Sequence, residues 1–410
     1  MKIVGNNPII PHDGVCDPHI HIFGGKAYLY STHDDGPGHD IYTMYDWRVF
    51  SSDDLVHWTL ESTLCPEDTY IGATSECYAT DAAERDGKYY FYFSHQQYST
   101  GVAVGDAPGG PFRDALGRAL LPKGLADTAS YDPTVFVDDD PQRTPYIVFG
   151  YQWVGKRYYI ARLNEDMISL AETPRPITIE GDWVGSDASW ITKRGGVYYL
   201  NSHEAAYALS DSIYGPYVSR KPFYKDAHAD HGTFFDFHNQ NYFAYGVPEN
   251  WGAEQVDPFY RTTKIAYAGW KQNGDIVVDP ASCRVGVGQY DAAWGVIPAS
   301  WYFSATDGLH KEEDGDRFVV TGGREGEKLT YPNWRGIPER PTLTLCACCA
   351  KADGEIEILA DGVSAGRCHV PCSAEFVPVQ VVLPLSAGTH EIALTFHGEQ
   401  ISVASLALQS

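Results

Sequence analysis

The sequence predicts an all-β protein, and three observations support this fold class. Short runs of aromatic residues, which favour strands, recur along the chain, as in Tyr89-Tyr90-Phe91-Tyr92-Phe93. Glycine and proline interrupt the first 290 residues at short intervals, and no long helical periodicity appears there. Finally, a polar residue, a small turn and an aromatic run follow one another in the same order five times. Such a repeat is typical of a β-propeller, in which each unit forms one small antiparallel sheet.

The five repeated units step by roughly 45–65 residues along the chain, close to the length of propeller blades. Because the innermost strand of a blade lines a central channel, the polar residues that head the units are expected to converge on one axis. These residues are Asp17, Asp81, Asp132, Asp187 and His231. Converging carboxyl groups are costly unless water, a cation or chemistry uses them. The alternative is that some are ordinary turn residues, although Asp17 and Asp132 share the same Asp-Pro context.

A second domain is expected, because 410 residues exceed what a single core usually holds. From residue 317 onward, short alternating runs are separated by turn signals, a pattern typical of a β-sandwich. The predicted strands include residues 318–320, 343–345, 355–359, 379–383 and 391–396. The sequence therefore predicts a five-bladed β-propeller over residues 1–295, followed by a smaller β-sandwich domain over residues 296–410.

The formal net charge of −24 argues against partners such as nucleic acids or anionic membranes, since their phosphates would be repelled. It suits an enzyme with a neutral substrate. The 28 tyrosines and 10 tryptophans suit a sugar site, where flat rings stack on C–H faces, although most of them are expected to be strand residues. No long apolar segment precedes the first unit, so we expect a cytoplasmic protein.

The nine cysteines fit no familiar disulfide framework. Cys346 and Cys349 have the Cys-x-x-Cys spacing of a zinc site, but in a strand they would point to opposite faces. No second pair follows at the usual interval. We therefore expect reduced, mostly buried thiols.

Five motifs follow one another in about the first 290 residues. The motifs are Asp17-Pro18-His19-Ile20, Ser51-Ser52-Asp53-Asp54-Leu55-Val56-His57-Trp58, Gly87-Lys88-Tyr89-Tyr90-Phe91-Tyr92-Phe93-Ser94, Tyr131-Asp132-Pro133-Thr134-Val135-Phe136-Val137-Asp138-Asp139-Asp140 and Asp230-His231-Gly232. In these motifs and their order, this part of the chain resembles family 43 glycoside hydrolases. The resemblance implies a five-bladed propeller that hydrolyses β-D-xylosides, α-L-arabinofuranosides or related linkages. The C-terminal part resembles the carbohydrate-binding β-sandwich modules that often follow such propellers.

The same resemblance implies roles for individual residues. Asp17 matches the general base, and Asp132 matches the residue that tunes and orients the general acid. Arg261 matches an arginine near the sugar. His231 matches the channel histidine, which often lies near a bound calcium ion or another cation, so the resemblance also implies a structural Ca²⁺ in the propeller channel.

The chain departs from the family at the general acid. The family has a glutamate before a Lys-Arg-Asn-Gly turn, whereas the matching segment here is Asp187-Ala188-Ser189-Trp190-Ile191-Thr192-Lys193-Arg194-Gly195-Gly196. Aspartate is shorter by one methylene, about 1.5 Å of reach, and a misplacement of about 1 Å can cost about a hundredfold in rate. Three interpretations follow: Asp187 is the acid at closer range, Glu204 replaces it, or the protein binds sugars without hydrolysing them.

The expected activity is exo-acting, inverting hydrolysis that removes terminal α-L-arabinofuranosyl or β-D-xylosyl residues from plant-derived oligosaccharides. Inverting glycosidases hold two carboxyl groups about 6.5–9.5 Å apart, so that a water molecule fits beside the base. The acid must be protonated, and a third carboxylate nearby favours that state. Asp17, Asp187 and Asp132 supply the right number and type of groups.

Five further residues are candidates for substrate binding. Tyr78, Trp153 and Trp47 are candidates for a sugar platform, although strand aromatics more often belong to the core. His33 and Asp34 are candidates for contacts with a sugar hydroxyl, although the pair equally suits a turn.

Overall fold

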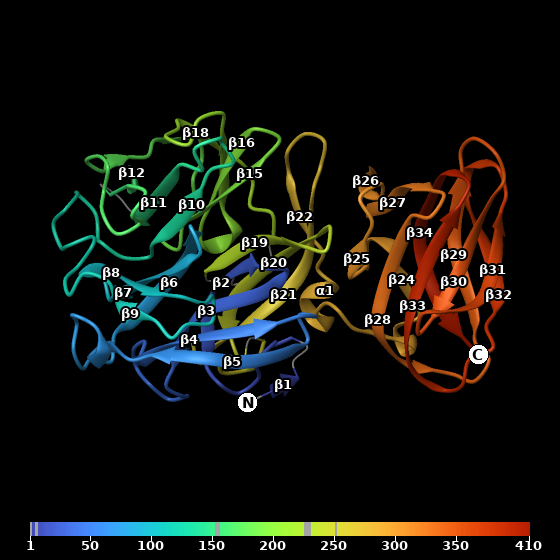
Figure 1. Ribbon diagram of the computed structural model, residues 1–410, viewed down its shortest axis with the longest axis horizontal. Helices are drawn as coiled ribbons and strands as arrows, with labels where there is room; N and C mark the ends of the chain where they lie inside the picture. The colour runs from blue at the N-terminus through green and yellow to red at the C-terminus, as the bar shows by residue number, and fades with distance from the viewer. Residues whose placement is uncertain (1, 5–6, 152–155, 225–230, 251, 316) are drawn as a thin grey trace. The chain divides into compact units, whose positions relative to one another are not determined.

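The computed structural model of the protein describes residues 2–4, 7–151, 156–224, 231–250, 252–315 and 317–410. Its regular secondary structure is almost all β-strand (Figure 1), which confirms the all-β prediction. Within these residues the only α-helix is α1 (Ser282–Val285). Four short 3₁₀ turns accompany it: η1 (Pro66–Asp68), η2 (His203–Ala205), η3 (Ala292–Trp294) and η4 (Ala299–Trp301). In the part of the chain described, no helix combines the length and apolar character needed to cross a membrane.

The chain divides into two compact units. The first comprises Met1–Phe235 with Phe243–Ile265, and the second comprises Asp236–Tyr242 with Ala266–Ser410. The domain boundary expected after residue 295 stays a prediction.

Five small, mostly antiparallel sheets follow one another along residues 2–278, one for each predicted repeat. In spatial order the first holds β1 (Lys2–Val4), β5 (His57–Leu64), β4 (Met44–Ser52), β3 (Lys26–Asp34) and β2 (Val15–Phe23), and the second β6 (Cys77–Arg85), β7 (Lys88–His95), β8 (Ser99–Gly105) and β9 (Arg113–Asp114). The third holds β10 (Thr134–Val137), β11 (Pro145–Gly150), β12 (Tyr158–Arg162) and β13 (Arg175–Pro176). The fourth holds β14 (Ile179–Glu180), β18 (Tyr217–Ser219), β17 (Tyr207–Ser210), β16 (Val197–Asn201) and β15 (Trp190–Arg194). The fifth holds β19 (Gly232–Phe237), β20 (Gln240–Pro248), β21 (Arg261–Trp270) and β22 (Ile276–Val278).

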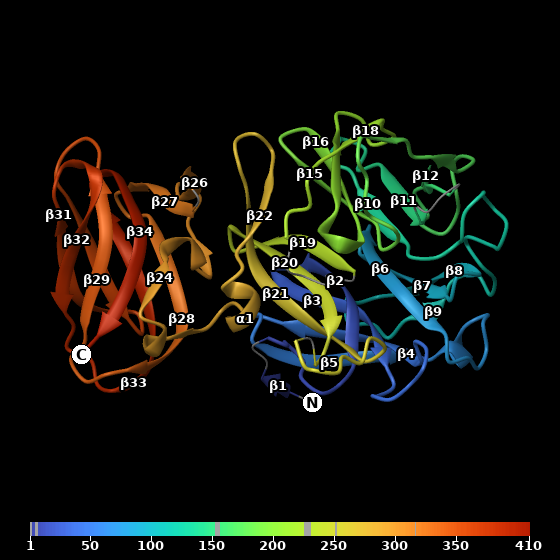
Figure 2. The ribbon, with the colours of Figure 1, turned by 180° about the vertical axis from the view of Figure 1, so that it is seen from behind.

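The five predicted polar residues lie in or just before one edge strand of each sheet. They are Asp17 in β2, Asp81 in β6, Asp132 before β10, Asp187 before β15 and His231 before β19. β6 packs against β2 and β10, and β10 packs against β15. The amide of Ile20 in β2 donates a hydrogen bond to Thr233 Oγ1 of β19 at 3.4 Å. Figures 1 and 2 show β2, β6, β10 and β19 converging in the middle of this region, so the repeat seen in the sequence brings these strands together.

The aromatic runs fill the space between neighbouring sheets. In β7, Phe91 and Phe93 pack in a cluster with Trp47 of the first sheet. Tyr92, which lies between them, packs in another cluster with Phe149 of the third sheet. Consecutive side chains of a strand point to opposite faces, so one aromatic run serves the cores on both sides of its sheet.

Tight hairpins connect the opening strands to the aromatic runs. Asp86-Gly87, between β6 and β7, has φ values of 53° and 74°. Gly195-Gly196, between β15 and β16, has φ values of 55° and 84°. Two successive positive φ values are typical of the type I′ turn, whose twist matches that of the flanking strands. These hairpins are the small turns of the predicted repeat.

The second unit contains two larger sheets, which lie face to face in Figures 1 and 2. One holds β23 (Tyr290–Asp291), β28 (Lys328–Ile337), β33 (Gly388–His397), β30 (Gly354–Ala360) and β31 (Val363–Val370), with β25 (Ser304–Ala305) on β28. The other holds β26 (His310–Asp314), β27 (Arg317–Arg324), β34 (Glu399–Gln409), β29 (Thr342–Cys349) and β32 (Ser373–Val382), with β24 (Val296–Pro298) on β34. This arrangement agrees with the predicted β-sandwich. Among the described residues the cysteines form no disulfide bond, and six of them are buried.

Candidate functional site

A cavity of about 330 Å³ in the first unit collects most of the predicted site residues. Six of them line it: Asp17, Tyr78, Asp132, Asp187, His231 and Arg261. The remaining lining residues are Tyr42, Met44, Ala79, Gln97, Tyr131, Ser186 and His203. Residues that are as much as 244 positions apart therefore meet in one cavity.

Asp17 is the most tightly held carboxylate of the cavity. It lies at a β-bulge of β2 with φ of 49°, and it is only 2% exposed. Arg261 donates from Nη1 to Oδ1 at 2.7 Å and from Nη2 to Oδ2 at 3.1 Å, and Thr32 Oγ1 donates to Oδ2 at 2.7 Å. Burial alone would raise the pKa of Asp17, but the charges of Arg261 and His231 and these hydrogen bonds lower it to about 2. Asp17 is therefore ionised at neutral pH.

Asp34 holds Arg261 from outside the cavity. Its carboxylate accepts hydrogen bonds from the backbone amide of Arg261 at 2.7 Å, from Nε at 3.0 Å and from Nη2 at 2.9 Å. Burial raises the pKa of Asp34 to about 6, although the charge of Arg261 opposes this. Asp34 does not line the cavity, so its position suits a support for the arginine. His33, predicted alongside it, also lies outside the lining, and its Nδ1 pairs with Asp46 at 3.0 Å.

Asp132 and His231 lie beside Asp17. His231 Nε2 is 3.8 Å from Asp17 Oδ1 and 3.6 Å from Asp132 Oδ2. Burial and the charge of Asp187 raise the pKa of Asp132 well above its usual range, although the amide of Ala188 donates to its Oδ2 at 3.1 Å. Burial lowers the pKa of His231 despite the nearby carboxylates. The pKa of Asp132 and that of the neighbouring Asp17 are thus shifted in opposite directions, and the lowered pKa of His231 favours a neutral imidazole.

Asp187 is the least buried of the three carboxyl groups, and its side chain is held by two hydroxyl groups. Tyr131 Oη donates to Oδ2 at 3.1 Å, and Ser186 Oγ donates to Oδ1 at 3.0 Å. Tyr131 immediately precedes Asp132, so one chain segment presents both the phenol and the neighbouring carboxyl group. Sequence reasoning missed Tyr131; its place beside a site aspartate was the one available signal.

The alternative acid, Glu204, does not line the cavity. Its side chain is 49% exposed, and its φ is 62°. The preceding residue, His203, is the member of this turn that lines the cavity. The position of Glu204 therefore gives no support to its use as the proton donor.

Tyr78, one of the residues predicted for an aromatic platform, lines the cavity together with Tyr42, which was not predicted. The rings of Tyr42 and Tyr78 meet edge to face with centroids 6.4 Å apart, and Arg261 Cζ lies 4.4 Å from the centre of the Tyr42 ring. Another predicted platform residue, Trp153, lies outside the described residues.

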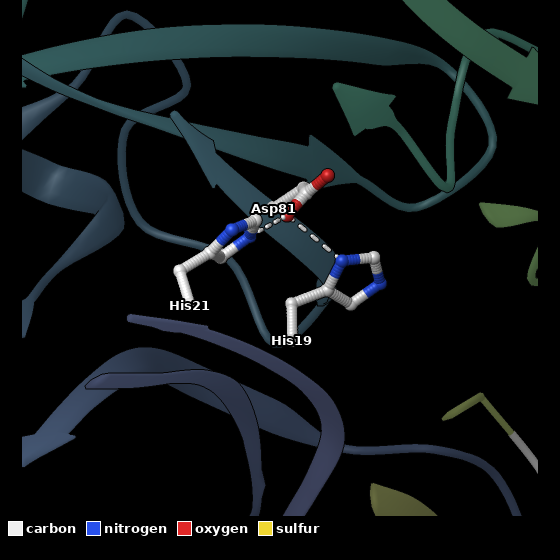
Figure 3. Close-up of side chains that lie close together, drawn as sticks. All are labelled: His19, His21 and Asp81. Carbon is white, nitrogen blue, oxygen red and sulfur yellow. Dashed lines mark hydrogen bonds and ion pairs between the residues drawn. The ribbon is translucent and has the colours of Figure 1, made fainter. Parts of the chain in front are cut away.

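Asp81, the remaining predicted axial residue, contacts two histidines instead of lining the cavity. His19 Nδ1 lies 2.8 Å and His21 Nε2 lies 2.6 Å from Asp81 Oδ1. Figure 3 shows both imidazole rings directed at this carboxyl group. Burial would raise the pKa of Asp81, but the two histidines more than offset this and lower it well below its usual range.

The expected calcium ion near His231 does not match the donors found there. His231 offers one imidazole nitrogen, whereas Ca²⁺ prefers six to eight oxygen ligands. His231 alone therefore does not make a calcium site, and the calcium ion stays a prediction.

Comparisons with known proteins identify what this arrangement is similar to. Residues 5–276 match the sequence model described as "Glycosyl hydrolases family 43". The chain is 32% identical to a "Xylosidase/arabinosidase" of Bacteroides ovatus over 51% of this chain and 78% of the relative. It is 27% identical to the crystal structure of a GH43_1 enzyme from Xanthomonas citri complexed with xylotriose, with a TM-score of 0.57 over 67% of this chain and 93% of the other.

A further likeness extends over nearly the whole chain. A family 43 arabinoxylan arabinofuranohydrolase from Bacillus subtilis, crystallised with cellotetraose, has a TM-score of 0.59 over 98% of this chain and 97% of the other, at 20% identity. At this identity the likeness concerns the fold, and it includes the second unit.

Proposed function

The chain belongs to glycosyl hydrolase family 43 and is a glycosidase, and from this premise we propose that it removes terminal α-L-arabinofuranosyl or β-D-xylosyl residues from short oligosaccharides, with inversion at the anomeric carbon. The observation that carries the proposal is the convergence of Asp17, Asp132 and Asp187 in one cavity with Arg261. The names of the relatives, xylosidase and arabinosidase, support this substrate class.

In the proposed reaction Asp17 is the general base. The bidentate contact with Arg261 keeps its carboxylate ionised and fixes its plane, so that it can accept a proton from a water molecule as that water attacks the anomeric carbon. Arg261 is itself fixed by Asp34. A base held in this way needs little rearrangement when the substrate binds.

Asp187 is the proposed general acid, which protonates the oxygen of the leaving group. Its partial exposure at the cavity suits contact with a leaving sugar, and Tyr131 and Ser186 restrict its rotation. Asp132 binds the amide of Ala188 and so supports the backbone that carries the acid. This agrees with the role in orienting the acid that the family resemblance implies for Asp132.

The cavity supports exo action. Its volume of about 330 Å³ lies at the small end of the range for ligand sites, about 300–1,000 Å³. A space of this size suits a terminal sugar residue better than the interior of a long polymer. The alternative of a sugar-binding protein without hydrolytic activity is not favoured, since the relatives are named as hydrolases.

The test is hydrolysis of aryl α-L-arabinofuranoside, aryl β-D-xyloside and the corresponding disaccharides, with the first product followed by NMR. Inversion is expected to release the opposite anomer from that of the substrate. Asp17→Ala is expected to lower kcat about 10²–10⁴-fold, whereas the exposed control Asp211→Asn keeps native rates. Retention of the anomeric configuration, or a fully active Asp17→Ala, would contradict the proposed mechanism.

A further inference from the structure

We propose that His19, His21 and Asp81 form a binding site for a divalent transition-metal ion, with Zn²⁺ as the expected ligand. The three donor atoms lie within 4.8 Å of one another. None of the three residues lines the cavity that holds Asp17, Asp132 and Asp187, so the proposed reaction leaves this cluster without a role.

Two neighbouring strands place the donors. His19 and His21 are two positions apart on β2 and therefore point to the same face, and β6, which carries Asp81, packs against β2. The pairing of β2 shifts register between Cys16 and His19. This bulge separates Asp17, which faces the cavity, from the two histidines, which face Asp81 (Figure 3).

The donor distances are close to those of a metal site. Bonds of about 2.0–2.2 Å place the ligand atoms of a tetrahedral zinc ion about 3.4 Å apart. The distances from Asp81 Oδ1 to His19 Nδ1 and His21 Nε2, 2.8 and 2.6 Å, are those of hydrogen bonds. An opening of less than about 1 Å would let an ion replace the protons that now link these groups.

Asp81 is fixed by the backbone in the manner of a metal ligand. Its Oδ1 accepts a hydrogen bond from the amide of Ala82 at 2.7 Å, and its Oδ2 accepts one from the amide of Val135 at 2.6 Å. Hydrogen bonds of this kind orient ligating carboxylates and tune the metal that they hold. Asp81 and His19 are almost fully buried, whereas the side chain of His21 is 28% exposed, which leaves an entry path and room for a water ligand.

The donor set selects the class of ion. Imidazole nitrogens suit Zn²⁺ and its transition-metal neighbours, whereas Ca²⁺ and Mg²⁺ favour oxygen ligands. A bound ion would join the first sheet to the second. Because the ion would bind the folded chain and not the unfolded chain, it would stabilise the fold.

The experiment is a titration of Zn²⁺ and, separately, of Ca²⁺ into the full chain after chelator treatment, followed by calorimetry and thermal unfolding. One equivalent of Zn²⁺ is expected to bind more tightly than Ca²⁺ and to raise Tm by roughly 5 °C at saturation. His21→Ala is expected to weaken Zn²⁺ binding at least tenfold. The matched control is His57→Ala, since His57 forms an exposed pair with Asp54 at 2.6 Å without a second histidine.

Two outcomes overturn the proposal: absence of stoichiometric Zn²⁺ binding by the native chain, or binding that His21→Ala leaves unchanged. Preference for Ca²⁺ overturns the assignment of the ion. If His21→Ala does not fold, the absorption spectrum of the native chain with Co²⁺ tests the proposal instead. Co²⁺ in a tetrahedral site of imidazole and carboxylate ligands is expected to give visible d–d absorption that Zn²⁺ displaces, and a silent spectrum counts against the site.

Discussion

Arg261 binds Asp17 through two parallel hydrogen bonds, Nη1 to Oδ1 at 2.7 Å and Nη2 to Oδ2 at 3.1 Å, while its Nε and Nη2 bind Asp34. One guanidinium group thus lies between two buried carboxyl groups whose pKa values are shifted in opposite directions, to about 2 for Asp17 and to about 6 for Asp34. The planar fork of arginine makes this possible, and lysine cannot reproduce it.

Arg261→Lys is expected to change the pH dependence of hydrolysis. In the native chain the pKa of Asp17 is about 2, so the base is ionised over the working range. Without the bidentate contact, burial raises that pKa. As the pH decreases, kcat/KM of the variant is therefore expected to begin to fall at a higher pH than kcat/KM of the native chain. Profiles of kcat/KM from pH 4 to 8 measure this, with Arg48→Lys as a control at an arginine that pairs with Asp13. Superimposable profiles would contradict the role of Arg261.

The lowered pKa of Asp17 also contributes to stability. The folded chain binds this proton less readily than the unfolded chain, whose ordinary value is 3.8. The contribution is therefore fully present above about pH 4 and is lost as the pH falls towards 2. Asp17→Asn is expected to flatten this part of the plot of unfolding free energy against pH. An unchanged slope between pH 4 and 2 would argue against the assigned shift.

Substitution of Asp187 is expected to separate two kinds of substrate. Aryl leaving groups need little protonation, so Asp187→Ala should lower kcat on disaccharides about 10²–10⁴-fold and affect aryl glycosides much less. Asp187→Glu lengthens the side chain by one methylene and so tests whether the shorter native acid suits this cavity. Equal losses on both substrates in Asp187→Ala would show that Asp187 is not the proton donor.

Tyr131→Phe removes the phenol that donates to Asp187 Oδ2 at 3.1 Å and keeps the buried ring. With its acid held by Ser186 alone, the variant is expected to lose about tenfold in kcat on disaccharides, with KM nearly unchanged. Steady-state kinetics on disaccharides and aryl glycosides measure both parameters. A loss of the same size on aryl glycosides would indicate a general structural effect instead of poor placement of the acid.

Gly14→Ala tests the support behind Arg261. A Cβ atom on Gly14 would lie 2.1 Å from the backbone oxygen of Asp34, whereas one on Gly24 would meet nothing within 4 Å. The two glycines have similar φ values, 62° and 58°, so the backbone strain of the substitution is matched. Gly14→Ala is expected to lower the free energy of unfolding by about 2 kcal/mol more than Gly24→Ala, and to lower kcat by displacing Asp34. Denaturant unfolding measures the free energy of unfolding of both variants, and equal losses of stability would contradict the clash.

Much of the fold was predictable because it repeats along the chain. The alternation of polar residue, turn and aromatic run corresponds to the opening strand, hairpin and second strand of each sheet, as β6, Asp86-Gly87 and β7 show. These features depend on local periodicity and on turn chemistry, which a single sequence displays. The order of the motifs likewise identified the family and pointed to Asp17, Asp132, Asp187 and Arg261, four residues that line one cavity.

Other parts of the site depended on tertiary structure alone. Asp34 was predicted as a sugar contact and Asp81 as an axial residue, yet Asp34 supports Arg261, which is 227 residues away, and Asp81 lies between two histidines of another sheet. Tyr131 gave no sign that its hydroxyl group reaches Asp187. A sequence shows which face of its own strand a side chain occupies, but contacts between sheets depend on register, bulges and packing distances, which form only when the whole chain folds.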